Sequence, residues 1–129
     1  VTALDMLARE TTQNNHLIVD FQKTGEERRL SHEVELSLYR IAQEALRNAI
    51  KHSKAGEVEI CLTCTTDLVE LVITDEGVGF VAEEGRKGAG LGLLSMAERA
   101  RLLGGRFQVD STPDSGTRVG VLISLAGKP

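Results

Sequence analysis

The sequence lacks both an apolar run long enough to cross a membrane and an excess of basic residues. Its longest apolar stretch, residues 119–127, is far short of the roughly 20 residues that a spanning helix needs. Lysine and arginine number 15 against 19 aspartates and glutamates, so the formal net charge is −4. A nucleic-acid-binding domain normally shows a basic patch or stripe instead. We therefore expect a soluble, cytoplasmic domain without a nucleic-acid partner and without direct membrane contact.

The chain also lacks a signal-peptide pattern and an initiating methionine. It begins at Val1, which favours a processed or excised fragment of a longer protein. Its 129 residues, 41% of them hydrophobic, are enough to bury the core of one domain. We expect residues 1–129 to form a single domain.

Cysteine is scarce as well, and its two copies, Cys61 and Cys64, have a Cys-x-x-Cys spacing. A structural zinc site needs four ligands, and no second pair of Cys or His residues has a suitable spacing. A redox pair would normally open a helix, whereas both cysteines fall inside a predicted strand. Residues three apart on a strand point to opposite faces, so we expect reduced, separately packed thiols.

Hydrophobic periodicity and turn residues predict alternating helices and strands. The predicted elements are a short helix from Val1 to about Glu10, a strand from His16 to Phe21, a helix from Ser31 to about Ser53, strands Val58–Cys64 and Leu68–Thr74, a helix from about Leu91 to Leu103, and strands Arg106–Asp110 and Thr117–Leu125. Residues 23–29 read as a charged loop, and Gly104-Gly105 as a helix stop. This order predicts an α/β fold, a two-layer sandwich with a mixed sheet of about five strands and about three helices on one face.

The helix that follows the N-cap residue Ser31 carries two stripes. Its apolar stripe consists of Val34, Leu38, Ile41, Ala42, Ala45 and Ala49. Glu44, Asn48 and Lys51 form a second stripe, because residues three and four apart share a helix face. A carboxylate, a neutral oxygen ligand and an ammonium in one direction suit a metal and a phosphate. An ordinary solvated face with charge pairs is the alternative.

Two glycine motifs follow this helix. Asp75 ends a strand and is followed by Gly77 and Gly79, so its carboxylate can accept from an exocyclic amine while the glycines let a planar base approach the backbone. A plain strand-terminating turn is the alternative. Residues 88–93, Gly-Ala-Gly-Leu-Gly-Leu, open a helix, where backbone N–H groups and the helix dipole favour a phosphate. The P-loop, Rossmann and protein-kinase motifs are absent.

The order of these motifs resembles the GHKL ATP-binding family, and within it the catalytic domain of bacterial sensor histidine kinases. Glu44–His52 is similar to the N box of that family, the two glycine motifs to its glycine boxes, and Ser115–Thr117 to its final Gly-Thr element. The segments Leu38–Ala45 and Gly92–Ala100 are most similar to the nitrate-sensor-type subfamily. The resemblance covers nearly the whole chain and implies the Bergerat fold.

The resemblance also implies ATP and Mg²⁺ as cofactors and assigns roles to single residues. Asn48 would ligate Mg²⁺, Glu44 would act as general base or orient the accepting imidazole, and Lys51 would neutralise phosphate charge. Asp75 would receive the adenine amino group, supported by Thr117. Residues 85–92 would form the ATP lid. The other implied nucleotide-binding residues are Gly77, Gly79, Arg86, Lys87, Gly88, Gly90, Leu91, Gly92 and Leu93.

None of the three histidines fits the role of phosphate acceptor. His32 lies only about a dozen residues before Glu44 on the same predicted helix, His52 ends the N box, and His16 opens a strand. The resemblance therefore implies a separate dimerisation and acceptor domain before Val1, for which residues 1–15 could be the linker tail. It further implies a response regulator downstream, a monomeric fragment and a homodimeric full-length protein. An anti-sigma-factor-like serine kinase and a non-catalytic nucleotide-sensing module are the alternatives.

Overall fold

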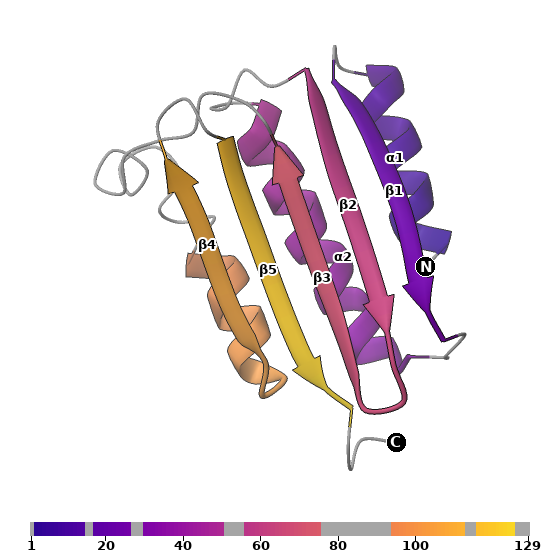
Figure 1. The fold of residues 1–129 in the computed structure, drawn as a ribbon, viewed down its shortest axis with the longest axis vertical. Helices are drawn as coiled ribbons and strands as arrows, with labels where there is room; N and C mark the ends of the chain where they lie inside the picture. The colour runs from indigo at the N-terminus through magenta and orange to yellow at the C-terminus, as the bar shows by residue number, and fades with distance from the viewer. Residues whose placement is uncertain are drawn as a thin grey trace.

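The computed structural model describes residues 2–14, 17–26, 30–50, 56–75, 94–112 and 116–125. Its elements are α1 (Thr2–Asn14), β1 (Ile18–Gly25), α2 (His32–Asn48), β2 (Glu57–Cys64), β3 (Leu68–Asp75), β4 (Arg106–Thr112) and β5 (Gly116–Ser124). Residues 94–102 form a further helix, drawn in orange and without a label in Figure 1.

The five strands form one mixed sheet in the order β1-β2-β3-β5-β4. β1 pairs with β2 in parallel, and all other neighbours pair antiparallel. Parallel neighbours need a crossover connection, and α2 lies within it. Figure 1 shows α1, α2 and the helix of residues 94–102 on the same face of the sheet. The predicted two-layer α/β sandwich is therefore confirmed.

The core lies between this sheet and the helices. Burial alternates along β2 and β3, so every second side chain points into the core. The predicted apolar stripe of α2 is buried, and each fully buried leucine or isoleucine contributes about 1.5–3 kcal/mol. Core residues from these three elements are Val34, Leu38, Ile41, Ala42, Ala45, Leu46, Val58, Ile60, Leu62, Cys64, Val69, Leu71 and Ile73.

Two predicted helix ends are confirmed by their hydrogen bonds. The Ser31 hydroxyl accepts from the Val34 N–H at 3.2 Å, as an N-cap residue does. Gly104 has a φ of 70°, its N–H donates to the Arg101 carbonyl, and the Gly105 N–H donates to the Ala100 carbonyl at 2.8 Å. This pair of bonds is a Schellman motif, which ends the helix of residues 94–102 at a left-handed glycine.

The predicted end of the first helix was wrong. The polar residues after Glu10 were expected to end it, but α1 continues to Asn14. The hydroxyl of Thr11 donates to the Leu7 carbonyl at 2.8 Å, and that of Thr12 to the Ala8 carbonyl at 3.0 Å. These hydroxyls bond back to their own helix and so do not compete with its backbone bonds.

The extent of the first strand was also wrong, since β1 runs from Ile18 to Gly25 and includes part of the predicted charged loop. Its parallel register with β2 continues up to the pair Gly25↔Cys64. Pairing with a strand so distant in the sequence overrides the local loop composition. β4 likewise extends to Thr112, two residues beyond its predicted end.

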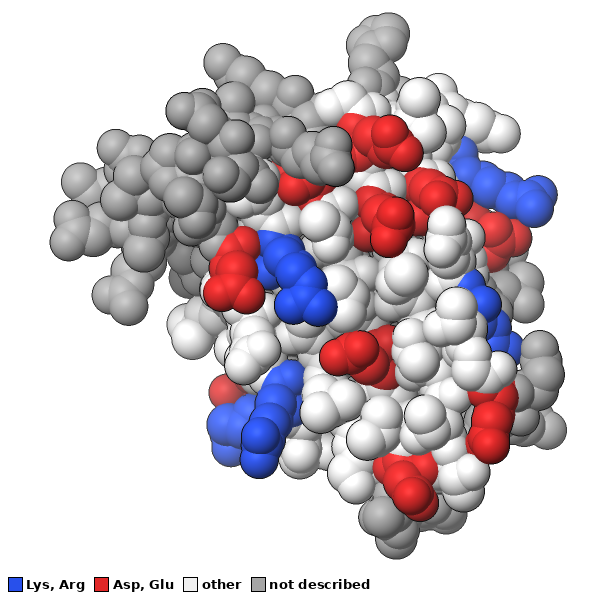
Figure 2. Space-filling model, viewed as in Figure 1, with Lys and Arg blue, Asp and Glu red and all other residues white. Residues whose placement is uncertain are grey.

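The sheet face away from the helices is acidic near β1, β2 and β3. The register places Asp20, Glu57, Glu59 and Glu70 on this face. Figure 2 shows acidic side chains gathered over these strands. Two arginines, Arg106 and Arg118, share the face on the side of β4 and β5. Most of the open face near β1–β3 therefore repels anions.

The two cysteines point to opposite faces of β2, as predicted, and neither forms a disulfide bond. Cys64 is buried in the core, whereas Cys61 is half-buried on the acidic open face. Burial, followed by the nearby charge of Glu59, raises the pKa of the Cys61 thiol above its ordinary value. A negative charge disfavours formation of a second one, so this thiol is a weak nucleophile.

Candidate functional site

Three elements end or begin at one edge of the sheet. β3 ends at Asp75, β5 begins at Gly116, and α2 ends at Asn48. Figure 1 shows the carboxyl ends of β3 and α2 and the start of β5 at the same edge. The polar side chains that the sequence singled out on these elements are therefore gathered in one region.

Asp75 is an acidic residue on the buried side of the sheet, with only 7% of its surface exposed. It lies directly opposite Thr117 on β5, and opposite residues of an antiparallel pair project from the same face. Both side chains therefore lie on the helix-covered face. A carboxylate in such a place needs hydrogen-bond donors. The predicted position of Asp75 at the strand end is confirmed, while its role toward a nucleobase stays a prediction.

Glu44 and Asn48 are both half-buried and lie one turn apart on α2. At about 1.5 Å of rise per residue, their Cα atoms are about 6 Å apart along the helix axis. They share a helix face, as the sequence predicted. Asn48 is the last residue of α2, so its amide is at the edge where Asp75 lies.

Most of the predicted phosphate-binding residues lie outside the described residues. These are Lys51, Gly77, Gly79, Arg86, Lys87, Gly88, Gly90, Leu91, Gly92 and Leu93. His16 and His52 also lie outside them. Among the described site residues, Asn48, Asp75 and Thr117 lie at one edge of the sheet, and Glu44 lies one turn before Asn48 on α2. The roles of all the predicted site residues stay predictions.

Glu44 also lines a polar cleft of about 310 Å³ between α2 and the helix of residues 94–102. The lining residues are Arg40, Gln43, Glu44, Arg47, Ser95 and Arg99. Of these, only Glu44 was singled out from the sequence. The repeat of Arg40, Glu44 and Arg47 at intervals of four and three residues was the available signal, because it places them on one helix face. We call this hollow the arginine cleft.

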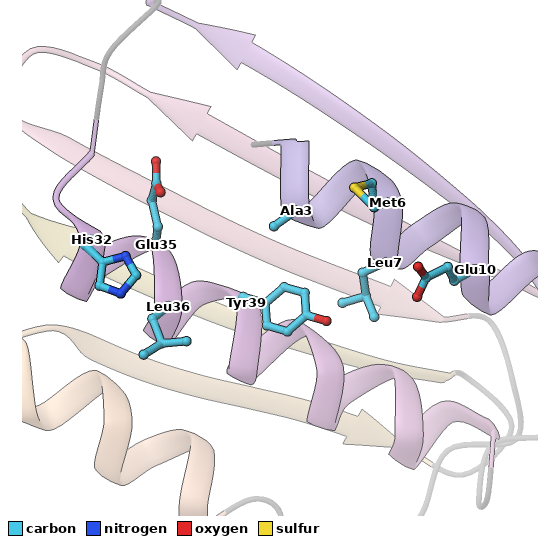
Figure 3. A pocket seen from close by; sticks show the side chains of 8 residues that line it. All are labelled: Ala3, Met6, Leu7, Glu10, His32, Glu35, Leu36 and Tyr39. Atoms are coloured by element: carbon cyan, nitrogen blue, oxygen red, sulfur yellow. The ribbon is translucent and has the colours of Figure 1, made fainter.

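A second hollow, of about 300 Å³, lies between α1 and α2. Figure 3 shows Met6 and Leu7 of α1 opposite Leu36 and Tyr39 of α2, so its lining is largely apolar. His32 lines this hollow and not the arginine cleft. As the first residue of α2 it is about 18 Å from Glu44 along the helix axis. The position of His32 agrees with its exclusion as an acceptor for Glu44.

Within the described ranges, no three His, Cys, Asp or Glu side chains come together as a metal site. None of the helices in those ranges has the length and apolar composition that crossing a membrane requires.

Comparison with known families assigns the class of protein. The family model described as histidine kinase-, DNA gyrase B- and HSP90-like ATPase matches residues 33–127. The match covers well over half of the chain, which therefore belongs to this ATPase family. The resemblance to the GHKL family seen in the sequence is thus confirmed.

Individual relatives narrow the comparison to sensor kinases. The chain is 41% identical over 102 residues to an uncharacterized sensor-like histidine kinase of Chloroflexus aurantiacus, covering 75% of this chain and 17% of that protein. It is 38% identical over 117 residues to the signal transduction histidine-protein kinase/phosphatase DegS of Bacillus subtilis, covering 88% of this chain and 30% of that protein. The chain therefore spans less than a third of the length of these relatives.

A solved structure supports the fold independently. The Acinetobacter baumannii histidine kinase AdeS superposes with a TM-score of 0.74 at 21% sequence identity. The superposition covers 98% of this chain and 62% of the AdeS chain. The described helices and strands, α1 included, therefore have the architecture found in that kinase.

Proposed function

We propose that this chain is the ATP-binding catalytic domain of a sensor histidine kinase, which transfers the γ-phosphate of ATP to a histidine on a separate helical domain. The observation that carries the proposal is the buried carboxylate of Asp75, placed opposite Thr117 at the edge where α2 ends with Asn48. Family membership and the sensor-kinase names of the relatives support it.

Asp75 would bind the adenine ring. Its carboxylate accepts hydrogen bonds only, which suits the exocyclic amine of adenine, and burial among strands β2, β3 and β5 strengthens that bond. Thr117, on the same face, would support the carboxylate directly or through a water. Gly77 and Gly79 would let the base approach the backbone.

Asn48 would hold Mg²⁺ through its amide oxygen. Mg²⁺ prefers oxygen ligands, keeps several waters and usually binds through substrate phosphates and only one or two protein groups, so a single half-buried amide at the end of α2 fits it. Bound Mg²⁺ would neutralise phosphate charge. Lys51, Arg86, Lys87 and the glycine motif of residues 88–93 would contact the phosphates.

In the proposed reaction, an imidazole nitrogen of the acceptor forms a bond to the γ-phosphorus while the bond to the bridging oxygen of ADP breaks. Glu44 would orient the imidazole and take its N–H proton. Phosphoryl transfer depends mainly on positioning and on stabilisation of charge, so few reactive side chains are required.

The proposal extends to the protein that contains this chain. Residues 1–129 would be one domain, with residues 1–15 partly linker, attached to a dimerisation and acceptor domain of the nitrate-sensor type. The phosphate would pass to a response regulator. The protein would act as a homodimer with this domain in the cytoplasm, where ATP is available.

Calorimetric titration with Mg-ATP and Mg-ADP tests the nucleotide site. We expect saturable binding that Asp75→Asn weakens about tenfold or more, since losing a charged hydrogen bond in a buried place costs about 1–3 kcal/mol. Asp110→Asn is the matched control, because Asp110 is exposed on β4. Circular dichroism would verify that both variants fold. Absence of binding, or binding equal in the two variants, refutes the site.

The chemistry of the product tests the reaction. With labelled ATP, the native protein should acquire phosphate that acid removes and alkali does not, as expected for phosphohistidine. An acid-stable product would indicate a serine kinase instead. Absence of label from a protein that binds ATP would favour a nucleotide-sensing module.

A further inference from the structure

The arginine cleft is a local concentration of positive charge in an acidic chain. Among the described residues, three arginines and one glutamate line it, whereas the whole chain has a net charge of −4. The acidic open face lies on the other side of the sheet from the helices that form the cleft. An anionic ligand that approaches this molecule is therefore attracted to the cleft and repelled by the opposite face near β1–β3.

The charges of this cleft are not balanced within the described part of the chain. Among the described residues, the ion pairs join Arg9 to Asp5 and Arg101 to Glu98, and none of these residues lines the cleft. Arg40 donates to the neutral Oε1 of Gln43 at 3.0 Å, which fixes its guanidinium without compensating its charge. Neither Arg47 nor Arg99 pairs with any carboxylate of the described residues. Among the described residues, these two guanidinium groups have no carboxylate partner that an external anion would have to displace.

The spacing of the arginines suits an elongated ligand. Arg40 and Arg47 are seven residues apart on α2, which is about 10 Å along the axis and about two helical turns. Arg99 lines the same cleft from the helix of residues 94–102. A phosphate group is compact, whereas carboxylates spaced along a helix would match this separation. Guanidinium groups bind carboxylates through two parallel hydrogen bonds, so such pairs also fix orientation.

Glu44 lies between Arg40 and Arg47 along α2 and gives the cleft a charge pattern of cation, anion, cation. A complementary surface would present an acid, an N–H donor and another acid. A histidine on a helix provides this pattern when aspartate or glutamate residues lie one or two turns away from it, because its imidazole supplies the N–H donor. The pattern thus distinguishes such a histidine from one that is flanked by lysines.

We propose that the arginine cleft is the docking surface for the acceptor helix, which presents its histidine to Glu44 between acidic side chains bound by Arg40, Arg47 and Arg99. The three arginines are positioning residues, and Glu44 is the residue that meets the imidazole. This inference rests on the proposed function, because it specifies the partner of that same reaction. It predicts acidic residues beside the target histidine of the native protein.

The test uses the native protein that carries this chain together with its acceptor helix. Initial rates of histidine phosphorylation from labelled Mg-ATP are measured for wild type, Arg99→Glu, Arg47→Glu and Arg101→Glu. Arg101 is the matched control, because it lies on the same helix as Arg99, does not line the cleft and pairs with Glu98. The Kd of Mg-ADP and the circular dichroism spectrum are measured for each variant.

We expect the two cleft variants to lose about tenfold or more in rate, since each places a glutamate against an acidic side chain of the acceptor helix and so opposes docking. Arg101→Glu should stay within about twofold of wild type, because exposed pairs contribute little. The Kd of Mg-ADP should also change less than about twofold in every variant. Replacing an acid beside the target histidine by arginine should restore the rate of Arg99→Glu and lower that of wild type.

Two outcomes overturn the inference alone. Cleft variants that phosphorylate as fast as wild type show that the arginines do not position the acceptor. Cleft variants that bind Mg-ADP about tenfold more weakly show that the cleft belongs to the nucleotide site. Failure of wild type to bind nucleotide or to label histidine instead refutes the proposed function, and the inference with it.

Discussion

Gly25 is the position where a single added carbon should be most harmful. Its φ is 89°, in the left-handed region, and a Cβ there would overlap the carbonyl oxygen of Cys64 on β2. The left-handed conformation costs an alanine about 1–2 kcal/mol. Relieving the overlap requires β1 and β2 to separate, with loss of the 2.8 Å bond from the Glu26 N–H to the same oxygen, for about 1 kcal/mol more. We expect Gly25→Ala to lower the free energy of unfolding by about 2–3 kcal/mol.

Urea denaturation followed by circular dichroism measures this loss, and two other glycines calibrate it. Gly104 also has a positive φ, of 70°, but a Cβ there meets nothing within 4 Å, so Gly104→Ala should cost only the conformational term of about 1–2 kcal/mol. Gly56 has neither constraint, and Gly56→Ala should be neutral or slightly stabilising.

Asparagine separates the two causes, because it tolerates the left-handed conformation but still carries a Cβ. It should recover most of the lost stability at Gly104 and little of it at Gly25. The reasoning is refuted if Gly25→Ala is as stable as Gly56→Ala, or if Gly25→Asn is as stable as wild type.

Two further predictions concern a helix cap and a thiol. Ser31→Ala should lower the free energy of unfolding by about 1 kcal/mol, because the Val34 N–H loses its acceptor. Ser31→Asp should retain the stability, since aspartate is also a good N-cap residue. Equal urea midpoints for Ser31→Ala and wild type would contradict the role of Ser31 as a cap. Cys61 should react slowly with a disulfide reagent near neutral pH and faster as pH rises through its raised pKa, and Glu59→Gln should accelerate the reaction by lowering that pKa. A reaction rate that Glu59→Gln leaves unchanged would show that the carboxylate does not act on the thiol.

The sequence could predict those elements whose signals are local. The apolar stripe of α2, its cap at Ser31 and the hairpin of β2 and β3 all depend on residues close together in the chain, and each was correct. The extent of β1 could not be predicted in this way. Its last residues are held by a parallel partner almost forty positions away.

The candidate site likewise has residues that local sequence signals could predict and residues that they could not. Asp75 could be found because it follows an apolar strand directly, and Glu44 and Asn48 because they share a helix face. The arginine cleft could not be found, because it exists only where α2 meets a helix some fifty residues later. Helical spacing places Arg40 and Arg47 on one face of α2, but no local pattern indicates that Arg99 of the later helix faces them.

The strand order has a consequence for how the site comes into being during folding. β2 with β3 and β4 with β5 are hairpins of neighbours in the chain, whereas β3 and β5 join these hairpins across more than forty positions between Asp75 and Thr117. Such distant pairings close long loops and form late. Asp75 and Thr117 belong to this late pairing, so neither hairpin alone contains both residues. Capture of nucleotide during refolding would therefore report completion of the sheet.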